Sequence, residues 1–270
     1  PAGPRERLNG TMELKDRICV ITGAASGIGA ATARAFQHEG AQVVVVDRNA
    51  QGAKAVADEV GGLAVECDVS KEEEVERLVE TVVSQYGKID LFFSNAGVGG
   101  GSDVLETPID EWQRQWEINV MGHVYAVRAV LPAMLERGEG YLVSTASMAG
   151  ILIAHSELPY TATKHAAVGL AKWLSITYHD RGIRSSLLAP LGVNTPMLGE
   201  TNSGFARHAA GPIREPEEVA QQVVDGVREE RFLILTDPIA QDWMQFQVAD
   251  NERWLTGMRR LQSKISSEKA

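Results

Sequence analysis

Short apolar runs alternate with helical patterns from residue 17 to residue 238, and this alternation limits the possible folds more than any other feature of the chain. Residues 43–46 are all valine, which is typical of a parallel strand that is covered on both faces. Strand–helix repeats predict an α/β fold, a doubly wound parallel sheet of about seven strands in a single domain. The predicted strands are residues 17–22, 41–47, 63–69, 89–97, 140–147, 184–190 and 231–238.

Amphipathic patterns between these strands predict helices at residues 29–39, 50–60, 72–87, 110–137 and 160–181. Pro132 lies inside the fourth helix, so we expect that helix to bend or split. After the last strand, apolar residues recur at helical spacing from 239 to 262, which predicts one or two further amphipathic helices. These helices either pack on their own domain, which we favour, or contact another subunit.

Composition argues against several classes of partner. The net charge is −10 and the pI is about 5.2, whereas a nucleic-acid-binding protein needs a basic surface. Cys19 and Cys67 lie in strand-like segments, which favours buried thiols in a reducing compartment over a disulfide. No apolar stretch approaches the ~18 residues that a membrane span needs. We therefore expect a cytoplasmic protein that binds neither nucleic acid nor membrane.

The segment VITGAASGIGAA joins the first strand to the first helix and contains Gly23, Gly27 and Gly29. Glycine permits positive φ and leaves room for a ligand close to the backbone. The helix that follows offers unpaired N–H groups and the positive end of its dipole, which suit a pyrophosphate. Glycines also occur in turns that bind nothing, but a strand before and a helix after are the context of a dinucleotide site.

Asp47 ends the second strand, 18 residues after Gly29. A carboxylate at this position accepts hydrogen bonds from both hydroxyls of an adenosine ribose and repels a 2′-phosphate. Arg48 is adjacent and would partly offset that repulsion. We therefore expect NAD, with NADP as the less favoured cofactor; without the glycines, Asp47 would equally suit an ordinary turn.

Tyr160 and Lys164 lie four residues apart in a predicted helix, so their side chains share one face. A free tyrosine has a pKa of about 10 and is a poor base at neutral pH. A neighbouring ammonium stabilises the phenolate and lowers that pKa. The pair therefore suits proton transfer to or from an alcohol oxygen, although the same spacing also occurs by chance on many helices.

Several motifs occur in an order that resembles the short-chain dehydrogenase/reductase family, and the resemblance covers about residues 14–238. Ser147 precedes Tyr160 by 13 residues, which is the interval that the family uses. The resemblance implies a Rossmann-like sheet, a nicotinamide cofactor and often a homotetramer. The motifs are TGAASGIG at 22–29, Asp47, Asp68 and Val69, Asn95–Gly97, Asn119, Ser147, and YxxxK at 160–164.

The same resemblance implies roles for individual residues. Tyr160 would transfer the proton, Ser147 would hold the substrate oxygen, and Asn119 would anchor a water that relays protons from Lys164. Lys164 would also bind the nicotinamide ribose. Asp68 would contact the adenine amine. The implied cofactor-binding residues are Gly23, Ser26, Gly27, Ile28, Gly29, Asp47, Arg48, Asp68, Val69, Asn95, Ala96, Gly97, Tyr160, Lys164, Pro190, Val193 and Thr195.

The chain departs from the family after the sixth strand, where Leu191 stands at a position that is usually glycine. Leucine does not freely adopt a glycine-only backbone conformation. Either the loop lies differently, or Gly192 takes over the turn, and the contacts of Thr195 depend on which of these holds.

The substrate pocket is expected to be mostly apolar, with a mobile lid at 196–212. Its apolar residues would include Ile153, Leu198 and Phe205. His155 either contacts substrate or is a surface loop histidine, which we favour. The other five histidines form no ligand cluster, so we expect no catalytic metal. The expected substrate-binding residues are Val98, Ser147, Leu152, His155, Tyr160 and Met197.

These features predict an NAD(P)-dependent oxidoreductase for a medium-sized hydrophobic secondary alcohol or ketone, active as a homo-oligomer (tetramer or dimer). Residues 1–13 would be a flexible extension, 14–238 the dinucleotide-binding and catalytic domain, and 239–270 a C-terminal helical extension of the same domain. Two alternatives stay open: a nicotinamide-binding sensor or scaffold without net turnover, and a dehydratase or epimerase on the same fold.

Overall fold

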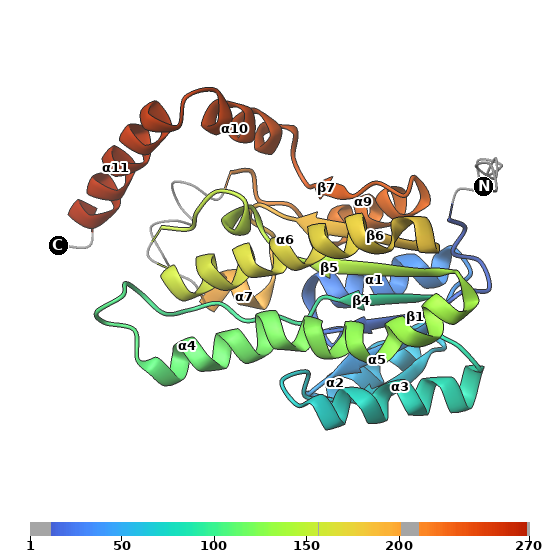
Figure 1. Cartoon of the computed structure of the whole chain (residues 1–270). Coiled ribbons are helices and arrows are strands. Elements are labelled where there is room, and N and C mark those ends of the chain that lie inside the picture. The colour runs from blue at the N-terminus through green and yellow to red at the C-terminus, as the bar shows by residue number, and fades with distance from the viewer. Residues whose placement is uncertain (1–11, 156, 201–210, 269–270) are drawn as a thin grey trace.

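The computed structural model describes residues 12–155, 157–200 and 211–268, without the side chains of residues 199, 200 and 268. Seven parallel strands form one sheet in the order β3-β2-β1-β4-β5-β6-β7, which confirms the predicted fold (Figure 1). The strands are β1 Ile18–Thr22, β2 Gln42–Asp47, β3 Leu63–Glu66, β4 Leu91–Ser94, β5 Gly140–Thr145, β6 Ile183–Ala189 and β7 Leu233–Leu235.

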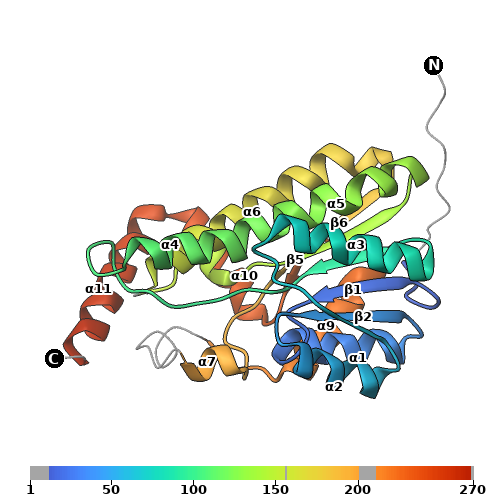
Figure 2. The same cartoon turned by 90° about the horizontal axis from the view of Figure 1, so that it is seen from below.

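Helices cover both faces of this sheet, with α1, α2 and α9 on one side and α3, α5 and α6 on the other (Figure 2). The period-two alternation of the strands divides the core accordingly. Cys19 and Ile21 of β1 pack in the cluster that contains α1 and α9, whereas Ile18 and Val20 pack against α3 and α5. The helices are α1 Gly27–His38, α2 Ala50–Val60, α3 Glu72–Tyr86, α4 Ile109–Trp116, α5 Gly122–Arg137, α6 Leu158–Tyr178, α7 Pro196–Glu200, α9 Pro216–Arg228, α10 Pro238–Ala249 and α11 Asn251–Glu268.

The chain builds the sheet outward from β1 to β3 and then crosses to β4 on the other side of β1. The loops after β1 and β4 therefore leave the sheet in opposite directions, and a crevice opens between them. In open α/β sheets, ligands bind in this crevice, beyond the carboxyl ends of the strands.

The fourth predicted helix, residues 110–137, splits at a different place from the one that Pro132 suggests. A π-helical turn at Glu117–Met121 separates α4 from α5, whereas α5 runs through Pro132 without interruption. Pro132 and Arg128 are both exposed, so the Arg128 carbonyl that loses its helical partner is accessible to water. Exposure therefore removes much of the penalty that a proline imposes inside a helix.

Residues 109–137 also contain an 18-residue window with a mean hydropathy of 1.3. This length and composition would suit a membrane span, contrary to the expectation that no stretch approaches it. In the structure, 44% of that window is buried inside the protein, and Ala126, Val130 and Met134 pack in the sheet core. The segment is thus a core helix of this domain.

The C-terminal region forms the two helices α10 and α11, which extend from the end of the sheet that carries β7 (Figure 1). Trp254 of α11 and Ala240 of α10 pack in a cluster with Met148 and Leu152, as the favoured prediction has it. The boundaries of the flexible N-terminal extension and of the predicted lid stay predictions, because residues 1–11 and 201–210, with Phe205, lie outside the described residues. Of the lid, residues 196–200 form the short helix α7.

Asp90 ties the start of β1 to the loop before β4. Its carboxylate accepts hydrogen bonds from Ile18 N (2.9 Å), Lys88 Nζ (2.8 Å) and Arg17 Nη1 (3.3 Å). Burial acts to raise the pKa of Asp90, but these hydrogen bonds and positive charges outweigh it, and the net pKa is lowered.

Replacing Asp90 with Asn should cost about 2 kcal/mol of unfolding free energy at neutral pH, because the charged acceptor is lost. A lowered pKa in the folded state stabilises the fold above the carboxyl's unfolded pKa, and this contribution disappears as pH falls through the folded pKa. The difference between wild type and D90N should therefore shrink below about pH 4. Urea denaturation at pH 7 and pH 3 measures it; an equal difference at both pH values would contradict the assignment.

Candidate active site

A cavity of about 480 Å³ opens at the carboxyl ends of the strands. It brings together most of the residues that the sequence singled out, from the glycine turn to the loop after β6. The predicted residues that line it are Gly23, Ser26, Gly27, Ile28, Asp47, Arg48, Asp68, Val69, Asn95, Ala96, Gly97, Val98, Ser147, Tyr160, Lys164, Pro190, Val193, Thr195 and Met197.

The glycine turn is too tightly packed to hold side chains. Gly23 has a φ of +66°, and a Cβ there would lie 2.8 Å from Ala96 Cα. A Cβ on Gly29 would lie 2.3 Å from the Gly23 carbonyl oxygen. The turn can thus approach β4 closely only as glycine. Ser26 caps α1 without a side-chain hydrogen bond, so the first N–H groups of the helix face the cavity as an anion site.

Asp47 is held in place at the end of β2. Its two carboxylate oxygens accept hydrogen bonds from Ala25 N (3.1 Å) and Asn49 N (2.9 Å). The first of these bonds links Asp47 directly to the glycine turn. Arg48, next to it, is exposed and also lines the cavity, so both of these predicted cofactor-binding residues belong to the cavity wall.

Asn95 uses its side chain to hold three strands together. Its Nδ2 donates to the Thr22 carbonyl oxygen (3.0 Å), and its Oδ1 accepts from Thr145 Oγ1 (3.0 Å). The Thr22 hydroxyl in turn accepts from the backbone N–H groups of Asn95 and Ala96 (3.0 and 3.1 Å). These bonds fix the carboxyl ends of β1, β4 and β5 relative to one another.

Asn119 lies in the π-helical turn and is fully buried. Its side chain pairs with both backbone groups of Val98: Oδ1 accepts from the N–H (2.8 Å) and Nδ2 donates to the carbonyl (2.9 Å). Nδ2 also donates to Thr163 Oγ1 of α6 (3.1 Å). Asn119 does not itself line the cavity, but it holds the loop after β4 against the helix that carries Tyr160.

Tyr160 and Lys164 emerge from the first turns of α6, which starts at Leu158 with Pro159 in a position that suits a helix start. The Lys164 Nζ lies 5.6 Å from the centre of the Tyr160 ring and donates to the Thr145 carbonyl oxygen (3.1 Å). Ser147 faces them from the end of β5, where its Oγ accepts from Ala149 N (3.1 Å). Three elements thus bring the predicted catalytic side chains to one wall of the cavity.

The pKa of Tyr160 differs from the sequence-based expectation. Burial raises it to about 12; the hydrogen-bonding Ser147 side chain acts to lower it, and the nearby Glu157 acts to raise it. Burial also lowers the pKa of Lys164 to about 8. The expected net lowering of the tyrosine pKa is therefore not found in the protein alone, because desolvation of the phenol dominates.

The loop after β6 resolves the question that Leu191 raised. Neither Leu191 nor Gly192 has a positive φ, so no glycine-only conformation is needed and Gly192 does not take over such a turn. The Leu191 N–H donates to Thr236 Oγ1 (3.1 Å), and Gly192 O accepts from Arg214 N (3.0 Å). Thr195 faces the glycine turn, since a Cβ on Gly27 would lie 3.1 Å from its Cγ2.

Three residues predicted for the substrate pocket, Leu152, Ile153 and His155, do not line the cavity. Ile153 packs against the cluster that contains Trp254. Leu152 packs with Met148 and Trp254 in the C-terminal cluster. His155 is buried, with only 4% of its surface exposed, and its Nδ1 lies 2.7 Å from Gln262 Oε1 of α11. The favoured surface position of His155 is thus wrong, because the C-terminal helix covers its loop, and His155 does not line the cavity.

Other residues that line the cavity were not predicted from the sequence. Glu157 lies between two residues that the sequence analysis named, His155 and Tyr160, but its carboxylate was not singled out. Its position three residues before Tyr160 is a signal that the sequence does contain. The lining residues for which no local pattern exists are Cys67, Arg114, Ile118, Thr145 and Ala146. Within the described parts of the chain, no three His, Cys, Asp or Glu side chains converge on a possible metal position.

Comparisons with known proteins agree with this geometry. A family model described as short chain dehydrogenase matches residues 17–205. A cyclohexanol dehydrogenase from Acinetobacter sp. is 35% identical over 219 residues, which cover 78% of this chain and 87% of that protein. A mitochondrial borneol dehydrogenase from Lavandula x intermedia is 34% identical over 212 residues, which cover 77% of this chain and 82% of that protein.

Among solved structures, a short chain dehydrogenase/reductase from Burkholderia phymatum in complex with NAD aligns with a TM-score of 0.80 at 30% identity. The alignment covers 89% of this chain and 96% of that one. The family model, the relatives and the shared fold lead to one conclusion. The chain belongs to the short-chain dehydrogenase/reductase family and is an oxidoreductase that acts on CH–OH groups of small molecules with a nicotinamide cofactor.

Proposed function

We propose that this protein interconverts a medium-sized hydrophobic secondary alcohol and its ketone, with NAD as the preferred cofactor. The observation that carries the proposal is the meeting of Ser147, Tyr160 and Lys164 in the wall of a cavity whose other end contains the glycine turn and Asp47.

The residues present fit a dinucleotide. The turn at Gly23 and Gly29 leaves no room for a Cβ, so a pyrophosphate can approach its backbone and the open N–H groups of α1. Asp47 lies at the end of β2, where its carboxylate would accept the ribose hydroxyls. When bound, the oxidised nicotinamide supplies a hydride acceptor and a positive charge.

In this proposal Tyr160 transfers the hydroxyl proton of the substrate, and Ser147 positions the substrate oxygen beside the phenol. With a pKa of about 12 in the protein alone, the phenol begins protonated and is ready to donate during ketone reduction. In alcohol oxidation Tyr160 must accept a proton, and a cationic Lys164 stabilises the phenolate that precedes this step. Because the pKa of Lys164 is lowered to about 8, it retains most of its charge at pH 7.

Apolar side chains support a hydrophobic substrate. Val98, Met148, Met197 and Leu198 line the cavity near the predicted catalytic wall. The two relatives named above take their names from cyclohexanol and borneol, which are both cyclic secondary alcohols. We propose cyclic alcohols as the first substrates to examine.

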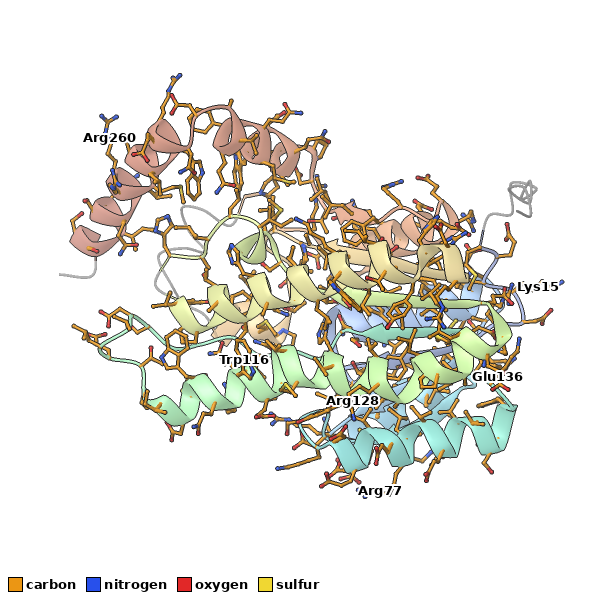
Figure 3. The ribbon with its side chains drawn as sticks, viewed as in Figure 1. Lys15, Arg77, Trp116, Arg128, Glu136 and Arg260 are labelled. Atoms are coloured by element: carbon orange, nitrogen blue, oxygen red, sulfur yellow. The ribbon has the colours of Figure 1, made fainter. Side chains whose placement is uncertain are left out.

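Exposed apolar residues support a homo-oligomer, a tetramer or a dimer. Trp173 and Ile176 lie about one turn apart on α6 and are 56% and 83% exposed. Trp116 at the end of α4 is 45% exposed (Figure 3). Large exposed apolar side chains on adjacent helices are typical of a subunit contact. The buried thiols of Cys19 and Cys67 support a reducing compartment such as the cytoplasm.

Thermal unfolding with NAD and with NADP tests the cofactor assignment without a substrate. NAD should raise the Tm more than NADP at equal concentration, since a ligand at 100 times its Kd adds about 2.7 kcal/mol of stability. Asp47→Asn keeps an acceptor for Ala25 N but removes the charge, so it should narrow the difference between the two cofactors. A larger shift with NADP in the wild type would overturn the NAD assignment.

Oxidation of cyclohexanol with NAD, followed by NADH absorbance, tests the substrate class. The same assay with linear secondary alcohols of equal carbon number is the comparison. Faster turnover of the linear alcohols would overturn the preference for cyclic substrates.

A further inference from the structure

Glu157 is a buried carboxylate in the cavity wall that the proposed proton transfer does not use. The residue is 8% exposed and lines the cavity. It caps α6, yet its side chain makes no capping hydrogen bond. Its backbone carbonyl accepts from Thr161 N (2.9 Å), but the carboxylate has no hydrogen-bond partner among the described residues. A ligand that fills the cavity would remove this carboxylate from water, which is costly unless the ligand supplies a hydrogen-bond partner.

The position of Glu157 relative to Tyr160 defines what it can touch. Glu157 is the N-cap residue of α6, Tyr160 lies three residues later in the first turn, and both residues line the cavity. The carboxylate is close enough to act on the pKa of the phenol. A substrate whose oxygen lies beside Tyr160 therefore places its adjacent atoms within reach of Glu157.

Among the described residues, none of the three cations that line the cavity, Arg48, Arg114 and Lys164, forms an ion pair with this carboxylate. Arg114 is bound to Glu111, with Nε–Oε2 and Nη2–Oε1 distances of 2.7 and 2.8 Å. Lys164 donates to the Thr145 carbonyl. Burial alone raises the pKa of Glu157, to about 7, with no contribution from a neighbouring charge. The hydrogen-bonding capacity of Glu157 is thus left for a ligand.

We propose that Glu157 selects substrates that carry a second hydrogen-bond donor, a hydroxyl or an amine, close to the reacting CH–OH or ketone group. The inference rests on the proposed function, because it needs the substrate oxygen beside Tyr160. A site built to bond a polar group rejects an analogue that lacks the group, since the buried partner is then left unpaired. The substrate class is accordingly a cyclic diol, hydroxyketone or amino alcohol rather than a simple cyclic alcohol.

Competition among three substrates tests the proposal: cyclohexanol, cyclohexane-1,2-diol and 2-aminocyclohexanol, each with NAD. Wild type should show a kcat/KM for the diol or the amino alcohol at least about 10-fold above that for cyclohexanol. Glu157→Leu should abolish this preference. Glu157→Gln, which keeps an acceptor but no charge, should retain preference for the diol and lose any for the amino alcohol. The two polar substrates thus distinguish a hydroxyl from an ammonium partner.

Glu136→Leu is the matched control, because Glu136 is exposed near the end of α5, remote from the cavity (Figure 3). This variant should keep the wild-type ratio of kcat/KM values. A wild type that oxidises cyclohexanol as well as both polar analogues, or an E157L variant that keeps the preference, would overturn the inference alone. A wild type that oxidises none of the cyclic alcohols with either nucleotide would overturn the inference and the proposed substrate class together.

A binding measurement separates selection from catalysis. In a Tyr160→Phe background with NAD present, cyclohexane-1,2-diol should raise the Tm more than cyclohexanol does, and the additional E157L substitution should remove that difference. Equal shifts for both alcohols in the Tyr160→Phe background would contradict a role of Glu157 in substrate binding.

Discussion

Replacing Tyr160 with Phe should lower kcat by about 10³-fold or more, which is the range that a positioned proton donor contributes to catalysis. Phenylalanine fills the same buried space beside Lys164 but has no hydroxyl to exchange a proton with the substrate oxygen. The Ser147 hydroxyl remains, but in the proposed mechanism it positions the substrate oxygen and does not replace the phenol as the proton donor. The free energy of NAD binding should change little, because the glycine turn and Asp47 are untouched.

Two measurements carry this prediction: kcat under saturating NAD and alcohol, and the NAD-induced shift in Tm. Tyr86→Phe in α3 is the control, since Tyr86 packs on the opposite side of the sheet core from the glycine turn and does not line the cavity. Its kcat should equal that of wild type. If Tyr160→Phe also kept wild-type kcat, the hydride-and-proton mechanism proposed for this wall would be wrong.

The parts of the fold and site that the sequence predicts are those set by local patterns. The alternation of strands and helices fixes the sheet because each apolar face must be buried. Gly23 and Gly29 predict a turn that packs closely against its neighbours. The four-residue spacing of Tyr160 and Lys164 predicts that both side chains lie on one helix face. The seven-strand sheet is confirmed by the structure, while the chemical roles of these residues stay predictions.

The features that the sequence does not predict depend on contacts between distant segments. His155 is buried, and one of its contacts is Gln262, which lies 107 residues later in the chain. Asn119 lies in the π-helical turn and contacts both Val98 and Thr163. No local sequence propensity predicts this turn or these contacts. The raised pKa of Tyr160 follows from burial, which is a property of the assembled cavity rather than of its spacing from Lys164.

Replacing Gly29 with Ala should lower the free energy of unfolding by about 3 kcal/mol, at the upper end of the cost of overpacking. The added Cβ would meet the Gly23 carbonyl oxygen at 2.3 Å and Asn95 Nδ2 at 2.7 Å. The first of these is backbone, and the second is held by the Thr22 carbonyl, so neither atom moves away cheaply. For a chain of this size the Tm should fall by roughly 6–12 °C.

Affinity for NAD should fall together with stability in G29A, because relief of the clash must move the turn that approaches the pyrophosphate. Gly257→Ala in α11 is the matched control: nothing lies within 4 Å of its added Cβ, and alanine in a helix gains up to about 1 kcal/mol over glycine. Thermal unfolding of both variants, with and without NAD, compares the same chemical change at a packed and an open position. If G29A instead unfolded at the same temperature as G257A and bound NAD equally well, the turn would accommodate a Cβ. Close backbone approach could then not be the reason for glycine at this position.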